Sequence, residues 1–319
     1  PALPALSFFL ILFFGKKMKY KGAEFGITAI ALSLILAICC VGQWMNQVDN
    51  ASDNYKKNTP YETEEKYSET SSQVLEQNAS AEPIEVASAE QMNIYAAGEE
   101  SGYEAVAVDA VIERFTWWET GGKKFQVGIM VDGLAVMMLF VVTVISLLVH
   151  IYSTDYVSGD RRYTHYFAFL SLFSASMLFF VLSENILQTI VGWELVGVCS
   201  FALIGHWWEE KPNSDAALKA FLTNRVGDMG LLVGMIILFW SAGSWSIVDI
   251  NVAAINNEIG QTTLLIASLC LTAAVMSKSG QFILHTWLPD AMAGPTPVSA
   301  LIHAATMVVA GIYMVARLY

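Results

Sequence analysis

The sequence predicts an all-α polytopic membrane protein, a bundle of transmembrane helices in which one helix is broken. Hydrophobic residues make up 55% of the 319 residues and charged residues only 14%, against about 25% charged residues in soluble domains. The apolar residues gather in runs of about 20, the length that a helix needs to cross a bilayer. Three of these runs contain ionisable residues near their middle.

We expect eight apolar helices, the first of them too short to cross a bilayer. The predicted spans are Leu3–Phe14, Phe25–Gly42, Val127–Ile151, Tyr166–Leu182, Ile186–Trp208, Ala216–Trp240, Thr262–Leu288 and Val298–Leu318. No basic region precedes Leu3–Phe14, so we interpret it as the end of a first helix in an N-terminal fragment and not as a signal peptide.

Basic residues lie in alternate short connections between these spans. Four lysines fall within residues 16–21, two arginines at 161–162 and Lys211 after the fifth span, whereas residues 183–185 and 241–261 contain no Lys or Arg. Because positively charged loops stay cytoplasmic, we expect these basic connections on the cytoplasmic side of a bacterial inner membrane.

The chain divides into three predicted segments: two N-terminal helices (1–45), an acidic extracytoplasmic insert (46–126) and the main helix bundle (127–319). The insert contains 16 acidic and 6 basic residues, so it accounts for most of the net charge of −12. Residues 50–102 are polar and predict disorder, and residues 106–126 predict a short cap or strand at the membrane surface. Acidity confined to one loop gives no reason to expect a nucleic-acid partner.

No motif predicts a metal or cofactor on this chain. The four cysteines, Cys39, Cys40, Cys199 and Cys270, lie in apolar runs without metal-ligand spacing, so we expect buried, inert thiols. Glycine-rich nucleotide motifs do not occur in the sequence.

Lys278 is the most informative residue. A charge near the bilayer centre costs at least about 2.5–3.5 kcal/mol and is normally kept for an ion or proton pathway. Glycines and prolines after Lys278 predict a broken helix, an arrangement typical of transporter sites. The residues of the predicted break are Gly280, Pro289, Pro295 and Pro297.

Two further spans carry candidate residues. Glu194, among small residues in mid-span, is either a proton-handling carboxylate or a buried carboxyl bonded to a neighbouring helix. Arg225 and Asp228 share one helix face and form either a structural ion pair or a gated carboxylate. One turn earlier, we expect Lys219 to pair with Asp215 at the membrane boundary.

Histidines flank the predicted break. His303, inside an apolar helix, either bonds a backbone carbonyl or relays a proton from Lys278, and His285 precedes the proline-rich connection. His150, His165 and His206 fall near span ends, where we expect interfacial positions. The role of Asp132, early in the third span, stays open.

Five motifs carry a family resemblance: Trp193–Gly197, Lys219–Asp228, Ser277–Ser279, His285–Met292 and Gly294–Met307. They resemble the antiporter-like subunits of respiratory complex I, NADH:quinone oxidoreductase, and among them most closely the chain L type. The resemblance covers residues 127–319 and fits the first two spans. The acidic insert is longer than is usual in this family.

The resemblance implies a fold, a function and partners. The fold is a bundle of two inverted five-helix repeats, of which residues 166–318 are the first. Glu194 and Lys278 would form a coupled pair in a proton channel, with Asp228 close by and His303 leading onward. NADH, FMN, iron–sulfur clusters and quinone would be bound by other subunits. The partners would be other membrane subunits, especially a neighbouring antiporter-like subunit, and the lipid bilayer.

Two alternatives stay open. Subunits of Mrp-type Na⁺/H⁺ antiporters resemble the chain around Trp287–Asp290 and Pro295–Val298 and share the glutamate and lysine, but residues 223–228 and 294–303 are closer to complex I. A membrane subunit whose buried charges only hold helices together is the other alternative.

Overall fold

The computed structural model describes residues 1–58, 108, 110–120, 123–304 and 306–318. Two compact units divide the chain, one formed by residues 1–41 and 110–319 and the other by residues 42–109. The predicted disorder of residues 50–102 falls mostly outside the described residues. At its start it is wrong, because α2 (Ala23–Asn58) continues as a helix to Asn58.

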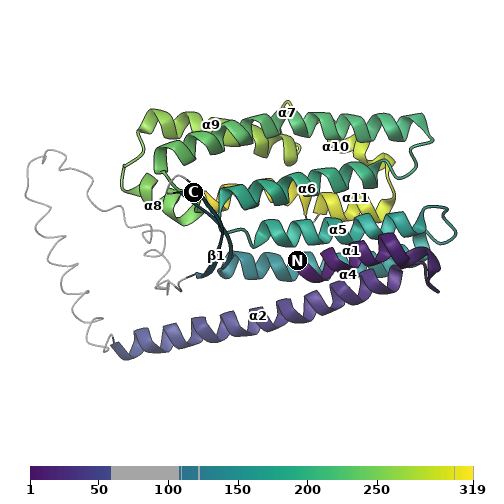
Figure 1. Ribbon diagram of the computed structural model, residues 1–319, viewed down its shortest axis with the longest axis horizontal. Coiled ribbons are helices and arrows are strands. Elements are labelled where there is room, and N and C mark those ends of the chain that lie inside the picture. The colour runs from purple at the N-terminus through teal and green to yellow at the C-terminus, as the bar shows by residue number, and fades with distance from the viewer. Residues whose placement is uncertain (59–107, 109, 121–122, 305, 319) are drawn as a thin grey trace, which may run out of the picture. The chain divides into compact units, whose positions relative to one another are not determined.

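The larger unit is a helix bundle with one β-hairpin (Figure 1). Seven helices of the described residues are long and apolar enough to cross a membrane, which confirms the predicted fold class. The elements of this unit other than α2 are α1 (Ala2–Phe14), η1 (Gly15–Lys17), β1 (Val111–Thr120), β2 (Lys123–Val131), α4 (Gly133–Tyr156), α5 (Tyr163–Val181), α6 (Ile186–Ile204), α7 (Lys211–Ala242), α8 (Ile247–Ile255), α9 (Gln261–Lys278), α10 (Trp287–Asp290), η2 (Ala291–Ala293), α11 (Thr296–Ala304) and α12 (Met307–Arg317).

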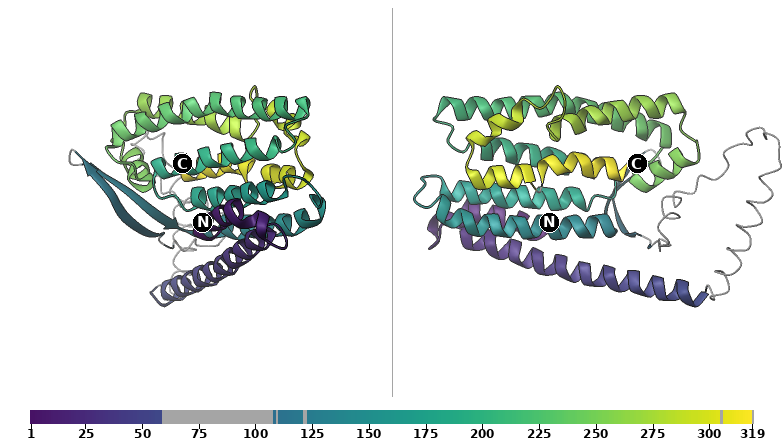
Figure 2. Two further views of the ribbon diagram at one scale, coloured as in Figure 1. Left: turned by 45° about the vertical axis from the view of Figure 1, so that its right-hand side comes forward. Right: turned by 180° about the vertical axis from the view of Figure 1, so that it is seen from behind.

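The helices pack in layers. In Figures 1 and 2, α7 and α9 form one side, and α4, α5 and α1 form the other. Between them, α6 contacts both α5 and α7, α11 contacts α4 and α6, and α12 contacts α9 and α11. The two helices after the break therefore run through the inside of the bundle.

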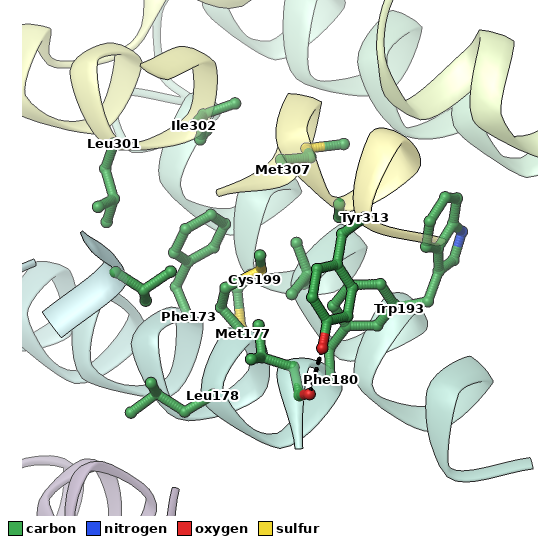
Figure 3. Close-up of a cluster of buried hydrophobic side chains, with 14 of the residues drawn as sticks. Phe173, Met177, Leu178, Phe180, Trp193, Cys199, Leu301, Ile302, Met307 and Tyr313 are labelled. Atoms are coloured by element: carbon green, nitrogen blue, oxygen red, sulfur yellow. Dashed lines mark hydrogen bonds between the residues drawn. The ribbon is translucent and has the colours of Figure 1, made fainter. Parts of the chain in front are cut away.

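Apolar side chains join α5 and α6 to α11 and α12 (Figure 3). Phe173 and Met177 of α5, Leu301 of α11 and Met307 of α12 are fully buried. Tyr313 of α12 donates a hydrogen bond of 2.6 Å to the backbone oxygen of Val181, so the polar end of this aromatic residue is satisfied inside the core.

The hairpin corrects one predicted boundary. Residues 127–131 belong to β2, which pairs antiparallel with β1, so the third span begins at Gly133 and not at Val127. The alternating, β-branched sequence of this segment favours a strand. Asp132 then starts α4 as its N-cap by accepting a hydrogen bond of 2.8 Å from the Ala135 N–H.

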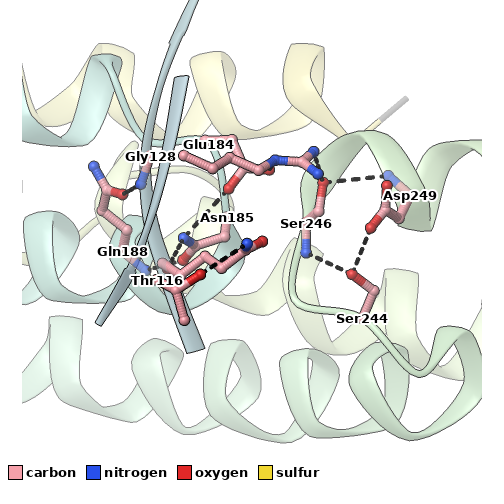
Figure 4. Close-up of polar contacts among 10 residues, drawn as sticks. Thr116, Gly128, Glu184, Asn185, Gln188, Ser244, Ser246 and Asp249 are labelled. Carbon is pink, nitrogen blue, oxygen red and sulfur yellow. Dashed lines mark hydrogen bonds and ion pairs between the residues drawn. The ribbon is translucent and has the colours of Figure 1, made fainter. Parts of the chain in front are cut away.

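The hairpin is bound to the ends of α5, α6 and α8 (Figure 4). Asn185 donates from its side chain to the Gln126 oxygen (2.7 Å), and the Gly128 N–H donates to the Gln188 side chain (3.2 Å). Arg114 of β1 pairs at 2.8 Å with Glu184, whose side chain is only 1% exposed. The helix α8, which the sequence did not predict, begins at this end of the bundle, directly after Ser246.

A buried ion pair closes the same end. Arg317 donates to both carboxylate oxygens of Asp132, at 2.5 and 2.9 Å, and its Nε donates to the Tyr313 hydroxyl at 2.8 Å. The bidentate geometry explains the role of Asp132 that the sequence left open, because it fixes the start of α4 to the end of α12.

Glycines allow α7 and α9 to approach closely. A Cβ on Gly230 would lie 2.4 Å from the backbone oxygen of Cys270, which cannot move without shifting α9. We therefore expect Gly230→Ala to destabilise the protein by about 1–3 kcal/mol, the usual cost of overpacking, measured by thermal unfolding in detergent.

Gly42→Ala is the matched control, because a Cβ there meets nothing within 4 Å. Equal stability of the two variants would show that α7 and α9 can move apart to accept the added methyl group without loss of stability, and would contradict this prediction.

Candidate functional site

The broken helix positions Lys278 at a helix end inside the bundle. After Lys278 the chain leaves the α-helix through Gly280, whose φ of 57° lies in the left-handed region. The Gln281 N–H donates to the Met276 oxygen at 2.8 Å. The C-terminal end of a helix carries partial negative charge, so the break itself favours a cation at this position.

Small residues make room for the lysine. A Cβ on Gly227 of α7 would lie 1.9 Å from Ser277 Oγ, and one on Gly197 of α6 would lie 3.0 Å from Lys278 Nζ. The ammonium group therefore lies directly against the backbone of α6, in a space that a larger residue would fill.

Lys278 is fully buried. Its Nζ lies 5.1 Å from the ring centroid of Trp193, within the range of a cation–π interaction. Within the described part of the chain, Nζ has no hydrogen-bond partner. A buried ammonium group without such a partner is rare because its desolvation is so unfavourable.

Trp193 connects the lysine to an acid. Its indole Nε1 donates a hydrogen bond of 2.6 Å to Asp228 Oδ1, and both side chains are buried. The charges of Asp228 and Glu194 both act on Lys278.

Arg225 lies between the two carboxylates. Its Nη1 forms an ion pair with Glu194 Oε2 and lies 3.9 Å from Asp228 Oδ2. Glu194 and Arg225 keep 26% and 34% of their side chains exposed on this chain, whereas Asp228 keeps 4%. One guanidinium is thus shared unequally by two acids.

Trp287 continues the cluster on the other side of the break. Its Nε1 donates a hydrogen bond of 2.8 Å to the backbone oxygen of Ser277, the residue before Lys278. The centroid of its ring lies 6.5 Å from the centroid of the His303 ring. His303 Nε2 is buried without a hydrogen-bond partner among the residues that the structure describes.

The structure brings together Glu194, Arg225, Asp228 and Lys278, and the predicted Arg225–Asp228 ion pair is present at 3.9 Å. Glu194 pairs with Arg225 and not directly with Lys278. The expected Lys219–Asp215 pair is wrong: Lys219 bonds Asp290 at 2.6 Å, because α10 packs on α7 after the break.

The histidine predictions also change. His303 lies in the last turn of α11, where helix stops at Ala304 and resumes at Met307, and not inside a continuous helix. His285 is exposed in the connection after the break. His150 and His206 are buried, at 0% and 1% exposed, where interfacial positions were predicted, and His150 faces α5 inside the bundle.

Of the predicted break residues, Gly280 follows the end of α9 and Pro295 directly precedes α11. Pro289 lies in the short helix α10, and Pro297 lies in the first turn of α11. The roles of Trp193 and Trp287 were missed. The signal was present, because a buried indole N–H needs an acceptor and each tryptophan stands in a motif with an ionisable residue.

Comparisons with known proteins agree with this arrangement. The model of the family described as NADH:quinone oxidoreductase/Mrp antiporter, TM, matches residues 183–319. That of the NADH-ubiquinone oxidoreductase (complex I) chain 5 N-terminus matches residues 117–167. The chloroplastic NAD(P)H-quinone oxidoreductase subunit 5 of Physcomitrium patens is 47% identical over 66% of this chain, and chain 5 from Picosynechococcus is 46% identical over 64%.

Solved structures show the same fold. A chain of an Mrp complex from Dietzia aligns with 64% of this chain at 30% identity and a TM-score of 0.59. The alignment covers 22% of the Dietzia chain. An archaeal membrane-bound sulfane sulfur reductase aligns with 99% of this chain and 51% of its own at 17% identity and a TM-score of 0.68, which is evidence for the fold alone.

The matched residues lie in a chain with several apolar helices, so the class that they indicate is a multi-pass membrane protein. Over residues 117–167 and 183–319 the chain is similar to the antiporter-like subunits of the complex I type. The chain spans about 30% of the length of the curated relatives that it matches.

The Trp193–Asp228 hydrogen bond gives a stability prediction. Trp193→Phe keeps an aromatic face beside Lys278 but removes the donor to Asp228. We expect a loss of about 1.5–3 kcal/mol, the usual contribution of a hydrogen bond to a charged group, measured by denaturant unfolding in detergent.

Trp240→Phe serves as the control, since Trp240 is 81% exposed and substitutions at such positions usually change stability by less than about 0.5 kcal/mol. If both variants unfolded alike, the indole bond would not stabilise the cluster.

Proposed function

We propose that this chain translocates protons as a membrane subunit of an NAD(P)H:quinone oxidoreductase, driven by quinone reduction elsewhere in the complex. The observation that carries the proposal is Lys278, a fully buried ammonium group without a hydrogen-bond partner in the described residues. A structural charge would be expected to have a close partner, whereas a group that gains and loses a proton needs a site compatible with both states.

Competition for Arg225 supplies a switching step. When Glu194 takes up a proton it no longer holds the guanidinium, which is free to close the 3.9 Å separation from Asp228. The charge of Asp228 is then balanced by Arg225 and that of Glu194 by its proton, so Lys278 loses the attraction of both acids and releases its proton. The charge of the cluster is unchanged, because one proton has arrived and one has left.

The energies are of the required size. Two unit charges 4 Å apart interact by about 4 kcal/mol at an effective dielectric constant of 20. Moving one proton against about 200 mV requires about 4.6 kcal/mol. Rearranging one ion pair is therefore comparable with the work of one translocation step.

The contacts around Trp287 support His303 as the next acceptor. The Trp287 indole holds the end of α9 next to Lys278 and its ring faces His303, whose Nε2 is free to receive a proton through water. The break between α11 and α12 lies directly after this histidine.

The resemblance to complex I subunits supports a wider proposal about partners, cofactors and membrane. We propose that NADH, FMN, iron–sulfur clusters and quinone are bound by other subunits, and that a neighbouring antiporter-like subunit is a direct partner. The chain would be the chain L type of subunit in a bacterial inner membrane, with lysines 16–21 and Arg162 on the cytoplasmic side.

An Mrp-type Na⁺/H⁺ antiporter subunit is the second candidate, supported by the 30% identity to the Dietzia Mrp complex. The two functions differ in their driving force. A Na⁺ flux driven by a pH gradient without electron transfer would favour the antiporter.

Lys278→Ala tests the proposal directly in the parent complex reconstituted into liposomes. We expect the complex to assemble and proton uptake per electron to fall, because the cluster loses the group that releases the proton. Electron transfer to quinone is recorded in the same vesicles.

Lys211→Ala, an exposed lysine at the start of α7, should leave the proton-to-electron ratio unchanged. Undiminished pumping by Lys278→Ala would make Lys278 a structural charge and would contradict the proposed channel.

A further inference from the structure

A second row of buried polar side chains lies away from the charge cluster, between α4 and α5. The members on α4 recur at intervals of three and four residues, which places them on one helix face. They face hydroxyl groups on α5, and none of these side chains is more than 1% exposed. The row consists of Thr143, Ser146, His150 and Ser153 on α4 with Tyr166, Ser171 and Ser174 on α5.

Hydrogen bonds join the two helices along this row. Ser174 donates to Ser146 Oγ at 3.2 Å, and Ser153 Oγ lies 3.0 Å from the Tyr166 hydroxyl. His150 lies between these two contacts, with Nδ1 2.7 Å from the Ser146 backbone oxygen and Nε2 3.4 Å from Ser171 Oγ.

The contacts of His150 determine its tautomer. A backbone oxygen only accepts hydrogen bonds, so Nδ1 carries the proton and Nε2 presents a lone pair toward Ser171. A proton can add at Nε2 without breaking the Nδ1 bond. Ser171 would then accept a hydrogen bond from Nε2, and its own O–H would turn to another acceptor.

The row reaches the basic end of the bundle at His206. His206 Nε2 lies 3.3 Å from Asp160 Oδ2, and its ring centroid lies 5.3 Å from that of Tyr166. Its Nδ1 is buried and has no partner among the described residues. A buried nitrogen of this kind is normally satisfied by an ordered water, so water is expected between His206 and the row.

His206 and Asp160 at this end both have pKa values below their ordinary values. Burial lowers the pKa of His206, against the attraction of Asp160. Burial opposes the ionisation of Asp160, but hydrogen bonds from the Arg162 N–H and the Trp207 indole hold its pKa below the usual value. Other titratable or charged groups at this end include Arg162, paired with Glu209, His165, and Glu24 of α2, whose charge acts on Tyr163.

A glycine of α2 packs against the row from a third helix. A Cβ on Gly26 of α2 would lie 3.0 Å from Ser171 Oγ and 3.1 Å from the His150 ring. A side chain at this position would press on the Nε2 side of His150, where the proton would arrive.

We infer that this row is a second hydrated path, which leads water and protons from the basic end of the bundle to His150. Its hydration is independent of the Glu194–Lys278 cluster, whereas its use in pumping rests on the proposed function. The simpler alternative is a dry polar contact that holds α4 to α5.

Cysteine accessibility separates these two possibilities without measuring pumping. Ser153→Cys, Ser171→Cys and the control Ser176→Cys are made in the complex, with the four native cysteines of this chain replaced by alanine. Ser176 is also buried on α5, but it bonds the Leu172 oxygen outside the row. Vesicles of either orientation are treated with 2-aminoethyl methanethiosulfonate, and labelling of this chain is followed by mass spectrometry.

We expect the cysteines at the two row positions to react with the reagent at least about tenfold faster than Ser176→Cys. A site without water raises the pKa of a cysteine thiol, and each unit of increase reduces the reactive thiolate fraction tenfold. The faster reaction should occur with reagent on the side of the basic end. Gly26→Ala should slow the labelling of Ser171→Cys, whereas Gly42→Ala should not. Equal labelling of all three positions would overturn the hydrated path.

His150→Gln tests the proton itself, because glutamine hydrogen-bonds but does not titrate in this range. If Ser153→Cys and Ser171→Cys are labelled as expected, a lower proton-to-electron ratio in His150→Gln supports proton transfer along the path. An unchanged ratio overturns the role of the path in proton transfer. The two proposals can fail separately. If Lys278→Ala pumped normally while the row cysteines were still labelled faster than Ser176→Cys, the proposed channel would be contradicted and the hydrated path would stand.

Discussion

The structure depends on keeping one ammonium group fully buried inside the helix bundle. Lys278 is completely buried, and three features make this tolerable: the C-terminal end of α9, the aromatic face of Trp193 and the charge of Asp228. None of them is a direct hydrogen bond. The lysine is therefore held by electrostatics at a distance, which a change of charge in the cluster can strengthen or weaken.

The neighbouring elements serve this arrangement. The break after Lys278 creates the helix end, and glycines of α6 and α7 bring the backbone close to the ammonium group and to Ser277. At the hairpin end of the bundle, the Arg317–Asp132 and Arg114–Glu184 pairs fix α12, α4 and the hairpin. The apolar core of α5, α6, α11 and α12 holds the helices that flank the cluster.

Sequence reasoning found the charged residues but not their partners. A charge in an apolar run is evident from the sequence alone, so Glu194, Asp228 and Lys278 were predictable. Which acid binds Arg225 was not, because a long guanidinium side chain on α7 reaches residues of its own helix and of α6. Lys219 shows the same limit, since its partner Asp290 is 71 residues away and becomes a neighbour only through the helix break.

The fold shows a similar division. The apolar spans were predicted, but α2 continues to Asn58 beyond the predicted end at Gly42, and α9 ends at Lys278 before the predicted end at Leu288. The break after α9 followed from glycine and proline. The start of α4 was not predicted correctly, because residues 127–131 are apolar enough for a span and become a strand only by pairing with β1. The short helix α8 was also not predicted. His150 was misplaced because position along a span does not reveal which side faces another helix.

Whether Lys278 must release its proton is the central question, and Lys278→Arg answers it most directly. Arginine keeps the positive charge but does not lose its proton at any relevant pH. Proton uptake and electron transfer would be measured together in the reconstituted complex. Our account predicts that the arginine variant transfers electrons but pumps fewer protons per electron. A variant that pumps at the normal ratio would show that a fixed charge is sufficient, and would contradict proton release by Lys278.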